Sequence, residues 1–251
     1  MVAETVKSPL RFEAMSCPCE ILLDSTDALL GAEQLEAAKS EADRIEKKFS
    51  RFLKGNIVEE INQSNGRKVK VDEETASLLD YAAECFGISN GLFDITRSAW
   101  DKVSWKRPYI QMPDGIKIDF GGICKEYASD CILRLLVNRY KISTLVNLGG
   151  DIAAVGERLW SVGIEDVSRP GKVAHTLYIR KGGVATSGTT KRAGHILNPK
   201  TGLPVADAPR SVTVAAKTCT EAGFWSTLAI LQGSRAEVFL EEQAVECWVF
   251  R

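Results

Sequence analysis

The chain has 251 residues, of which 45% are hydrophobic and 26% charged, and its formal net charge is −1 at pH 7. A charge this close to zero argues against a nucleic-acid-binding protein, because contact with many phosphates requires a basic surface. The sequence contains no run of about 18 apolar residues, so no membrane span is expected. Residues 1–11 lack the apolar core of a signal peptide. We therefore expect a cytoplasmic protein in which residues 1–251 form a single domain.

Seven cysteines are scattered along the sequence, an odd number that does not suggest a disulfide framework. Cys17 and Cys19 are separated by one residue, whereas zinc and redox motifs usually have two. Reduced thiols in a cytosolic protein are the expected state.

The N-terminal half combines strand and helix patterns. A strand is expected over residues 11–23, and residues 32–52 carry apolar side chains at helical spacing with charges on the other face. A second helix is expected over residues 72–85, with Asp72 placed to cap its N-terminus. Residues 92–105 carry several aromatic side chains and are expected to be irregular.

The C-terminal half is richer in strand patterns. A helix is expected over residues 125–138 and a buried strand over residues 143–147. Turn residues separate further predicted elements, which are strands at 152–155, 160–165, 174–179, 183–186, 211–216 and 245–251 and a helix at 220–231. Helices and antiparallel-looking strands occur in blocks, which favours an α+β fold with mixed or antiparallel sheets packed against helices.

The segment at residues 117–128 is the most informative one. It predicts a short strand, the turn Gly121-Gly122 and the start of a helix, an arrangement that directs free backbone N–H groups and a helix dipole at a ligand. Glycines permit close approach to the main chain. Asp119 before the turn and Lys125 after it supply charges of both signs. This combination suits a ligand that contains a polyol and a phosphate, although such turns often serve packing alone.

Three further segments each allow a functional and a structural interpretation. Asp94 could hold a heterocycle beside an aromatic wall or cap the next turn. Residues 149–151 (Gly-Gly-Asp) allow close approach to a ligand or a tight hairpin. The hydroxyl-rich residues 184–190 could bind phosphate or form a solvated turn.

Two side chains near the C-terminal end of the chain allow the same choice. His195 precedes a rigid Asn-Pro turn and could accept a proton or serve structure. Thr227 shares a helix face with Gly223 and could offer its hydroxyl to a ligand or to its own helix backbone.

Taken in order, these segments resemble the FAD:protein FMN transferase family, the ApbE flavin transferases. The matching blocks are residues 15–20, 50–52, 91–94, 119–128, Asp130, 146–151, 160–164, 185–188, 195–202 and 225–227. They extend over nearly the whole chain, so the resemblance implies an ApbE-like fold throughout.

The resemblance implies an enzyme that moves FMN from FAD onto a threonine or serine hydroxyl of an acceptor flavoprotein, releasing AMP, with Mg²⁺. Acceptors in the family are subunits of sodium pumps, related electron-transfer complexes and fumarate-type reductases. His195 matches the essential histidine, a candidate base for the acceptor hydroxyl. By motif position, the residues implied to bind FAD are Met15, Phe52, Leu92, Phe93, Asp94, Asp119, Lys125 and Leu197, and those at the metal are Gly122, Ser226 and Thr227.

Several positions depart from the family pattern, most importantly at the metal. The family has an aspartate four residues before the helix threonine, where this chain has Gly223, and Ser226 stands where an aspartate also occurs. A hard cation prefers carboxylate oxygen, so the site is expected to lack its main anion. Gly223→Asp is therefore expected to tighten Mg²⁺ binding and raise activity. Glu221 could lend a carboxylate, but it is two residues from position 223, which is about 200° around a helix with 3.6 residues per turn.

Other departures concern the flavin region. Phe52 replaces a common tyrosine, Glu126 replaces a glycine after the lysine, and the stretch between Asp94 and Asp119 is short. Three functions consequently remain open, which are an active flavin transferase, a non-catalytic FAD-binding protein, and an FAD pyrophosphatase in which water replaces the acceptor.

Overall fold

The structure is a computed structural model that describes residues 9–25, 27–189 and 196–251. Its centre is a seven-stranded sheet with the order β1-β2-β6-β7-β10-β11-β12, in which every neighbouring pair is antiparallel. The strands are β1 (Leu10–Ala14), β2 (Cys17–Leu23), β6 (Thr144–Leu148), β7 (Asp151–Val155), β10 (Gly182–Gly188), β11 (Ser211–Ala216) and β12 (Glu246–Phe250).

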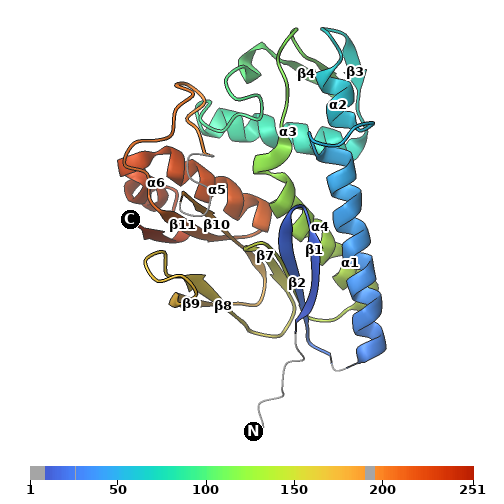
Figure 1. The fold of residues 1–251 in the computed structure, drawn as a ribbon, viewed down its shortest axis with the longest axis vertical. Coiled ribbons are helices and arrows are strands. Elements are labelled where there is room, and N and C mark those ends of the chain that lie inside the picture. Colours follow the sequence, from blue (N-terminus) through green and yellow to red (C-terminus); the bar gives the residue numbers. More distant parts are fainter. Residues whose placement is uncertain (1–8, 26, 190–195) are drawn as a thin grey trace.

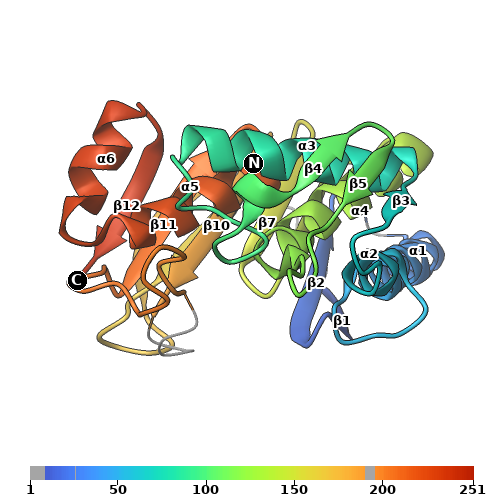
Figure 2. The ribbon, with the colours of Figure 1, turned by 90° about the horizontal axis from the view of Figure 1, so that it is seen from above.

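Helices pack against this sheet. They are α1 (Ala28–Phe49), α2 (Ile57–Asn62), α3 (Glu73–Ile88), α4 (Cys124–Tyr140), α5 (Cys219–Leu231) and α6 (Ala236–Glu242), with short 3₁₀ turns at Trp100–Lys102, Phe120–Gly122 and Gly233–Arg235. Helix α4 packs on β6 and β7, and α5 packs on β10 and β11. Figures 1 and 2 show α1 along one side of the molecule and α6 at the opposite end. The α+β class expected from the sequence is confirmed.

Two smaller sheets complete the fold. Strands β8 (Trp160–Glu165) and β9 (Val173–Ile179) form a hairpin, whose Trp160 and Leu177 pack with Leu145, Ile152 and Val184 of the central sheet in a second hydrophobic cluster. Strands β3 (Lys68–Lys70), β4 (Ser104–Lys106) and β5 (Tyr109–Gln111) form a three-stranded sheet beside α3. The middle strands of the central sheet thus lie between the helices and the β8–β9 hairpin.

The single strand predicted over residues 11–23 is in fact two strands, because the chain turns back there to form the β1–β2 hairpin. Its turn is made by Met15 and Ser16, which both have positive φ angles of 51° and 58°. Two-residue hairpin turns of this kind normally use Asn or Gly at these positions. A Met-Ser pair carries no such signal, so the sequence pattern could not reveal the turn.

The four helices expected from the sequence are present with ends that differ by a few residues, whereas α2 and α6 were not expected. Helix α1 begins at Ala28 rather than at residue 32, because the Asp27 side chain accepts hydrogen bonds from the amides of Leu29 and Leu30. The predicted cap at Asp72 is confirmed, since its side chain accepts from the Thr75 amide. Capping side chains satisfy N–H groups that have no partner inside the helix.

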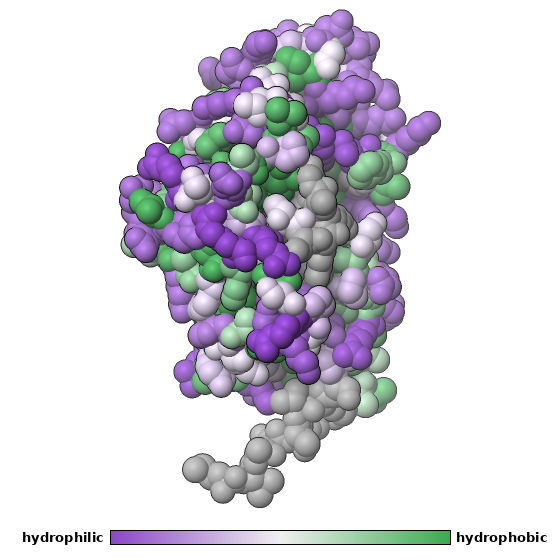
Figure 3. Space-filling view, turned by 60° about the vertical axis from the view of Figure 1, so that its left-hand side comes forward, coloured by the Kyte–Doolittle hydropathy of each residue, from purple (hydrophilic) through white to green (hydrophobic). Residues whose placement is uncertain are grey.

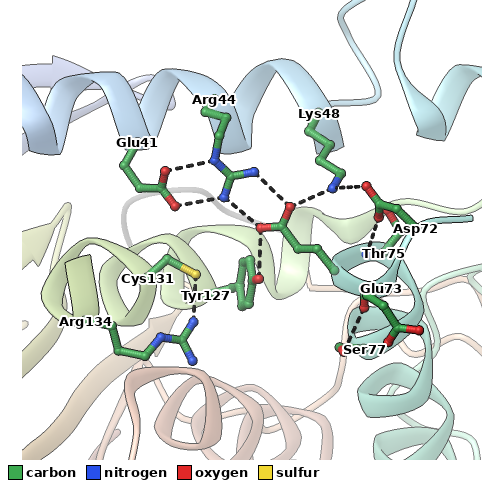
Figure 4. Close-up of polar contacts among 11 residues, drawn as sticks. Glu41, Arg44, Lys48, Asp72, Glu73, Thr75, Ser77, Tyr127, Cys131 and Arg134 are labelled. Carbon is green, nitrogen blue, oxygen red and sulfur yellow. Dashed lines mark hydrogen bonds and ion pairs between the residues drawn. The ribbon is translucent and has the colours of Figure 1, made fainter. Parts of the chain in front are cut away.

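A polar network joins α1, α3 and α4 (Figure 4). Glu74 on α3 pairs with Arg44 of α1 at 2.7 Å and with Lys48 of α1 at 2.6 Å, and it accepts a hydrogen bond from the Tyr127 hydroxyl of α4 at 3.0 Å. The Arg44 bond is the largest cause that lowers the pKa of Glu74, to about 2. The network therefore ties three helices together through one carboxylate.

Hydrophilic residues predominate on the face shown in Figure 3, with hydrophobic residues interspersed among them. Such a mixture is ordinary for the surface of a folded domain. Across the described part of the chain, no helix combines the length and apolar character required to cross a bilayer.

Candidate active site

A cavity of about 1300 Å³ lies where loops from both halves of the chain meet. Small-molecule pockets typically measure about 300–1,000 Å³, so this one has room for a dinucleotide. Nine of the residues singled out from the sequence line it, namely Phe52, Leu92, Phe93, Asp94, Asp119, Gly122, Lys125, Leu197 and Thr227. The fold therefore gathers into one cavity residues that are widely separated in sequence.

The Gly121-Gly122 turn forms one wall of the cavity just before α4. Asp119 caps the 3₁₀ turn there, since its Oδ1 accepts a hydrogen bond from the Gly121 amide at 2.9 Å. Its Oδ2 lies 3.1 Å from Arg97 Nη2 and 3.3 Å from Arg51 Nε. Both arginines also line the cavity. Sequence reasoning assigned neither of them a role, although Arg51 lies within a block that resembles the family.

Asp94 has the capping role that the sequence left open, and its proposed contact with a heterocycle stays a prediction. Its Oδ1 accepts hydrogen bonds from the amide and the hydroxyl of Thr96, both at 2.7 Å. Its Oδ2 accepts from the amides of Ser98, Ala99 and Trp100. The carboxylate thus organises the loop that follows it, while the residue borders the cavity.

A buried ion pair joins Lys125 of α4 to Asp151 at the start of β7, with Nζ 2.6 Å from Oδ2 and the Asp151 side chain only 5% exposed. Burial raises the pKa of Asp151, and the charge of Lys125 opposes that shift. Burial alone would lower the pKa of Lys125, but neighbouring carboxylates, Asp151 foremost, hold it above its usual value. The sequence indicated both residues but not their pairing, which depends on α4 crossing β7.

The Gly149-Gly150 pair forms the β6–β7 hairpin turn, as one interpretation of this segment expected, and it also lines the cavity. The two glycines have φ angles of 65° and 104°, which side chains rarely adopt. A Cβ on Gly149 would lie 2.9 Å from Cys17 Cβ.

All seven cysteines lie in the described part of the chain and are free thiols.

Hydroxyl groups from β10 and α5 form a cluster at the cavity wall. Ser187 Oγ lies 2.9 Å from both Ser226 Oγ and Thr227 Oγ1. Ser226 is fully buried and bonds the Gly223 carbonyl of its own helix at 3.1 Å. The back-bond considered for Thr227 is therefore made by Ser226, and Thr227 faces the cavity. Sequence reasoning gave Ser187 no individual role, although it lies in the hydroxyl-rich turn and in a block that resembles the family.

Glu126, in the first turn of α4, also lines the cavity. It is 8% exposed, and its Oε2 has no hydrogen-bond partner among the described residues. Burial is the largest cause that raises the pKa of this carboxyl, to about 8. Within the described ranges, no three His, Cys, Asp or Glu side chains cluster as a metal site. Neutral oxygens of Gly122 and Thr227, together with this unpartnered carboxylate, nevertheless fit a hard cation.

The other implied residues differ in their placement. Met15 and Ser226 do not line the cavity, because Met15 packs against the hydrophobic core and Ser226 lies inside α5. Phe52 is 80% exposed, with the Arg51 guanidinium 4.6 Å from its ring centre. His195 lies outside the described residues, so its proposed role stays a prediction.

Comparison with known proteins identifies related sequences. The sequence profile of the ApbE family matches residues 15–107 and 97–249. An FAD:protein FMN transferase from Klebsiella pneumoniae (strain 342) is 32% identical over 129 residues, which cover 48% of this chain and 40% of the relative. A protein of the same name from Treponema pallidum (strain Nichols) is 34% identical over 140 residues, covering 47% of this chain and 39% of the relative. These alignments therefore span about two-fifths of each curated relative.

Solved structures share the fold over nearly the full chain. The ApbE protein from Thermotoga maritima MSB8 has a TM-score of 0.88 at 26% identity, covering 96% of this chain and 93% of that chain. The apo form of the flavinyl transferase ApbE from Pseudomonas stutzeri has a TM-score of 0.82 at 21% identity, covering 99% and 92%. At that identity the second match shows the fold alone. The ApbE-like fold expected from the sequence is confirmed.

Proposed function

The chain belongs to the ApbE family, and on that premise we propose that it transfers the FMN half of FAD to an acceptor flavoprotein. The acceptor group is a threonine or serine hydroxyl, and AMP is the other product. The observation that carries this proposal is the cavity of about 1300 Å³, which combines the Gly121-Gly122 turn, Lys125 and an aromatic wall at Phe93. Those features suit a ligand with a pyrophosphate and a flavin ring.

The proposed reaction replaces one phosphate bond by another. The acceptor hydroxyl oxygen forms a bond to the phosphorus of the FMN half, the pyrophosphate bond breaks, and AMP leaves with the other phosphate. His195 takes the hydroxyl proton in this scheme. Catalysis of phosphoryl transfer depends mainly on positioning and charge stabilisation. Lys125 and the N-terminus of α4 supply positive potential beside the pyrophosphate.

Mg²⁺ is proposed as the metal, held by the Gly122 carbonyl and the Thr227 hydroxyl together with phosphate oxygens. When bound, it would neutralise charge that develops on the pyrophosphate. Arg51 and Arg97 lie beside Asp119 on the cavity wall, and we propose that Asp119 holds the flavin or its polyol while the arginines orient it.

One assay distinguishes the three functions considered from the sequence. The protein is incubated with FAD, Mg²⁺ and a candidate acceptor flavoprotein, and covalent flavin fluorescence is read on a denaturing gel while AMP and FMN are quantified. Labelled acceptor with AMP supports transfer, free FMN with AMP indicates a pyrophosphatase, and FAD binding without either product indicates a binding protein.

The histidine is tested in the same assay. General bases contribute about 10²–10⁴-fold to rate, so His195→Ala should lower transfer by that order while FAD affinity changes little. A transfer rate within a few-fold of that of the unaltered protein would show that His195 is not the base.

We also propose that the protein is located in the cytoplasm.

A further inference from the structure

Glu126 is a buried carboxylate that the proposed function leaves unused. It projects from the first turn of α4 into the cavity wall with an exposure of 8%, and its Oε2 lacks a hydrogen-bond partner in the described part of the chain. The neighbouring Lys125 Nζ bonds Asp151 Oδ2 at 2.6 Å instead. Burying a polar oxygen without a hydrogen-bond partner is costly, so Oε2 is expected to have a ligand.

Gly223 on α5 is what makes room for this side chain. A Cβ at position 223 would lie 2.6 Å from Glu126 Cγ and 2.9 Å from its Oε1. Gly223 has no positive φ and lies inside the helix, so its backbone does not require glycine there. Glycine in the interior of a helix lowers the stability of that helix relative to other residues. Space for Glu126 is thus the physical reason for Gly223.

The contact also sets the direction of the carboxylate. Gly223 and Thr227 are four residues apart on α5 and therefore share one helix face. Because Glu126 packs against Gly223, its carboxylate reaches that face from α4. Glu126, Gly122 and Thr227 all line the same cavity. The arrangement brings one anionic oxygen to the place where the other candidate ligands are neutral.

We propose that Glu126 supplies the carboxylate ligand of a divalent-cation site completed by the Thr227 hydroxyl and the Gly122 carbonyl. The inference rests on the proposed function, in which FAD phosphates provide further oxygens. Mg²⁺ binds poorly to neutral oxygens alone and is usually held by one or two carboxylates together with phosphates. The anion missing at position 223 thus comes from the neighbouring helix, and the metal site is complete.

This geometry reverses the effect expected for Gly223→Asp from the sequence. The new side chain would collide with Glu126 at 2.6 Å, and two carboxylates would share one buried space, where like charges repel. The single substitution should therefore weaken metal binding instead of strengthening it. Removing the Glu126 side chain at the same time should create the space that an aspartate needs.

The first test is metal affinity in Glu126→Gln, which keeps the shape and removes the charge. Mn²⁺ binding is measured by electron paramagnetic resonance and Mg²⁺ binding by calorimetry, each with and without FAD. We expect affinity to fall by about tenfold or more, because a charged ligand is lost. Glu221→Gln is the matched control, since Glu221 lies on α5 outside the cavity lining and bonds the Lys217 amide. It should bind metal like the unaltered protein.

The second test exchanges the two positions. Glu126→Ala and Gly223→Asp should each bind Mn²⁺ weakly, whereas the double variant Glu126→Ala/Gly223→Asp should regain most of the affinity. Gly223→Ala introduces the steric contact without the charge and should resemble Gly223→Asp. A folding defect cannot imitate this pattern, because the double variant carries both changes.

FAD affinity without metal separates this inference from the proposed function. Unchanged Mn²⁺ affinity in Glu126→Gln, or a double variant no better than the single ones, overturns the role of Glu126 even when FAD binds and transfer occurs. Failure of the unaltered protein to bind FAD would overturn the proposed function. The Mn²⁺ titrations without FAD would still decide whether Glu126 is a metal ligand.

Discussion

Lys125 carries a positive charge that the proposal places beside the pyrophosphate, and Asp151 fixes its position through the 2.6 Å ion pair. Lys125→Met should destabilise the protein by about 3 kcal/mol, because it leaves a buried carboxylate without its partner. Lys125→Met/Asp151→Asn should lose less than the sum of the single changes, with a coupling energy of about 1–3 kcal/mol. Urea denaturation of all four proteins measures this. Additive losses would mean that the pair does not interact.

Asp119 has a binding role in the proposal and a structural role in the fold. Asp119→Ala removes the bond to the Gly121 amide, which should cost about 1 kcal/mol, as for other caps. The exposed pairs with Arg51 and Arg97 should add little. FAD affinity, followed by flavin fluorescence, should fall more than the apo stability does. Unchanged affinity with a large fall in apo melting temperature would assign Asp119 to the fold instead.

The sequence could identify individual site residues but not their relationships. Gly121, Gly122, Asp119 and Lys125 are adjacent in the chain, so their joint role was predictable from one segment. Glu126 and Gly223 lie on different helices, and only their contact explains why one departs from the family pattern together with the other. Comparison position by position therefore treated the two departures from the family pattern as unrelated, whereas the two residues are in contact in the structure.

At the scale of elements, the bridge between α1, α3 and α4 depends on the charge of Glu74. Its pKa is lowered to about 2 by Arg44 first, then by Lys48 and Tyr127, against an ordinary value of about 4.3. A group with a lowered folded pKa contributes stability above its unfolded pKa and loses it as the pH falls through the folded pKa. Between about pH 4.3 and pH 2 this contribution should therefore disappear.

Glu74→Gln tests this interpretation. Because Glu74 and its partner Arg44 are partly exposed to solvent, screening limits the expected loss at pH 7 to about 1 kcal/mol. The substitution should make the melting temperature fall less steeply between about pH 5 and 2 than it does in the unaltered protein. Circular dichroism measures both melting temperatures. Glu84→Gln on α3 is the control, because Glu84 is exposed and has no ion pair in the described structure. An equally steep fall in both proteins would contradict the role of Glu74.

Element prediction succeeded where local chemistry decides and failed where it does not. Asp72 capped its helix as expected, because a capping side chain acts on amides within its own turn. The hairpin at Met15 and Ser16 was missed because its positive φ angles are imposed by pairing of β1 with β2, and through β2 with β6, rather than by turn residues. Strand order within the central sheet likewise depends on contacts between distant segments.

At the scale of the whole molecule, the cavity draws on both halves of the chain. Phe52 and Asp94 come from the N-terminal half, whereas Leu197 and Thr227 follow β10 in the C-terminal half. A ligand that contacts both should stabilise them together. The expectation that residues 1–251 unfold as one domain stays a prediction, and the same ligand can test it.

FAD should raise the melting temperature of the protein in a single transition. At a concentration of one hundred times its dissociation constant, a ligand that binds only the folded state adds about 2.7 kcal/mol. For a chain of this size that corresponds to roughly 5–10 °C. FMN or AMP at the same concentration should produce smaller shifts, because each fills only part of the cavity. Differential scanning calorimetry with each nucleotide measures these shifts. Two transitions, of which FAD moves one, would contradict the single domain, and equal shifts for FMN and FAD would show that the adenylate half makes no contact.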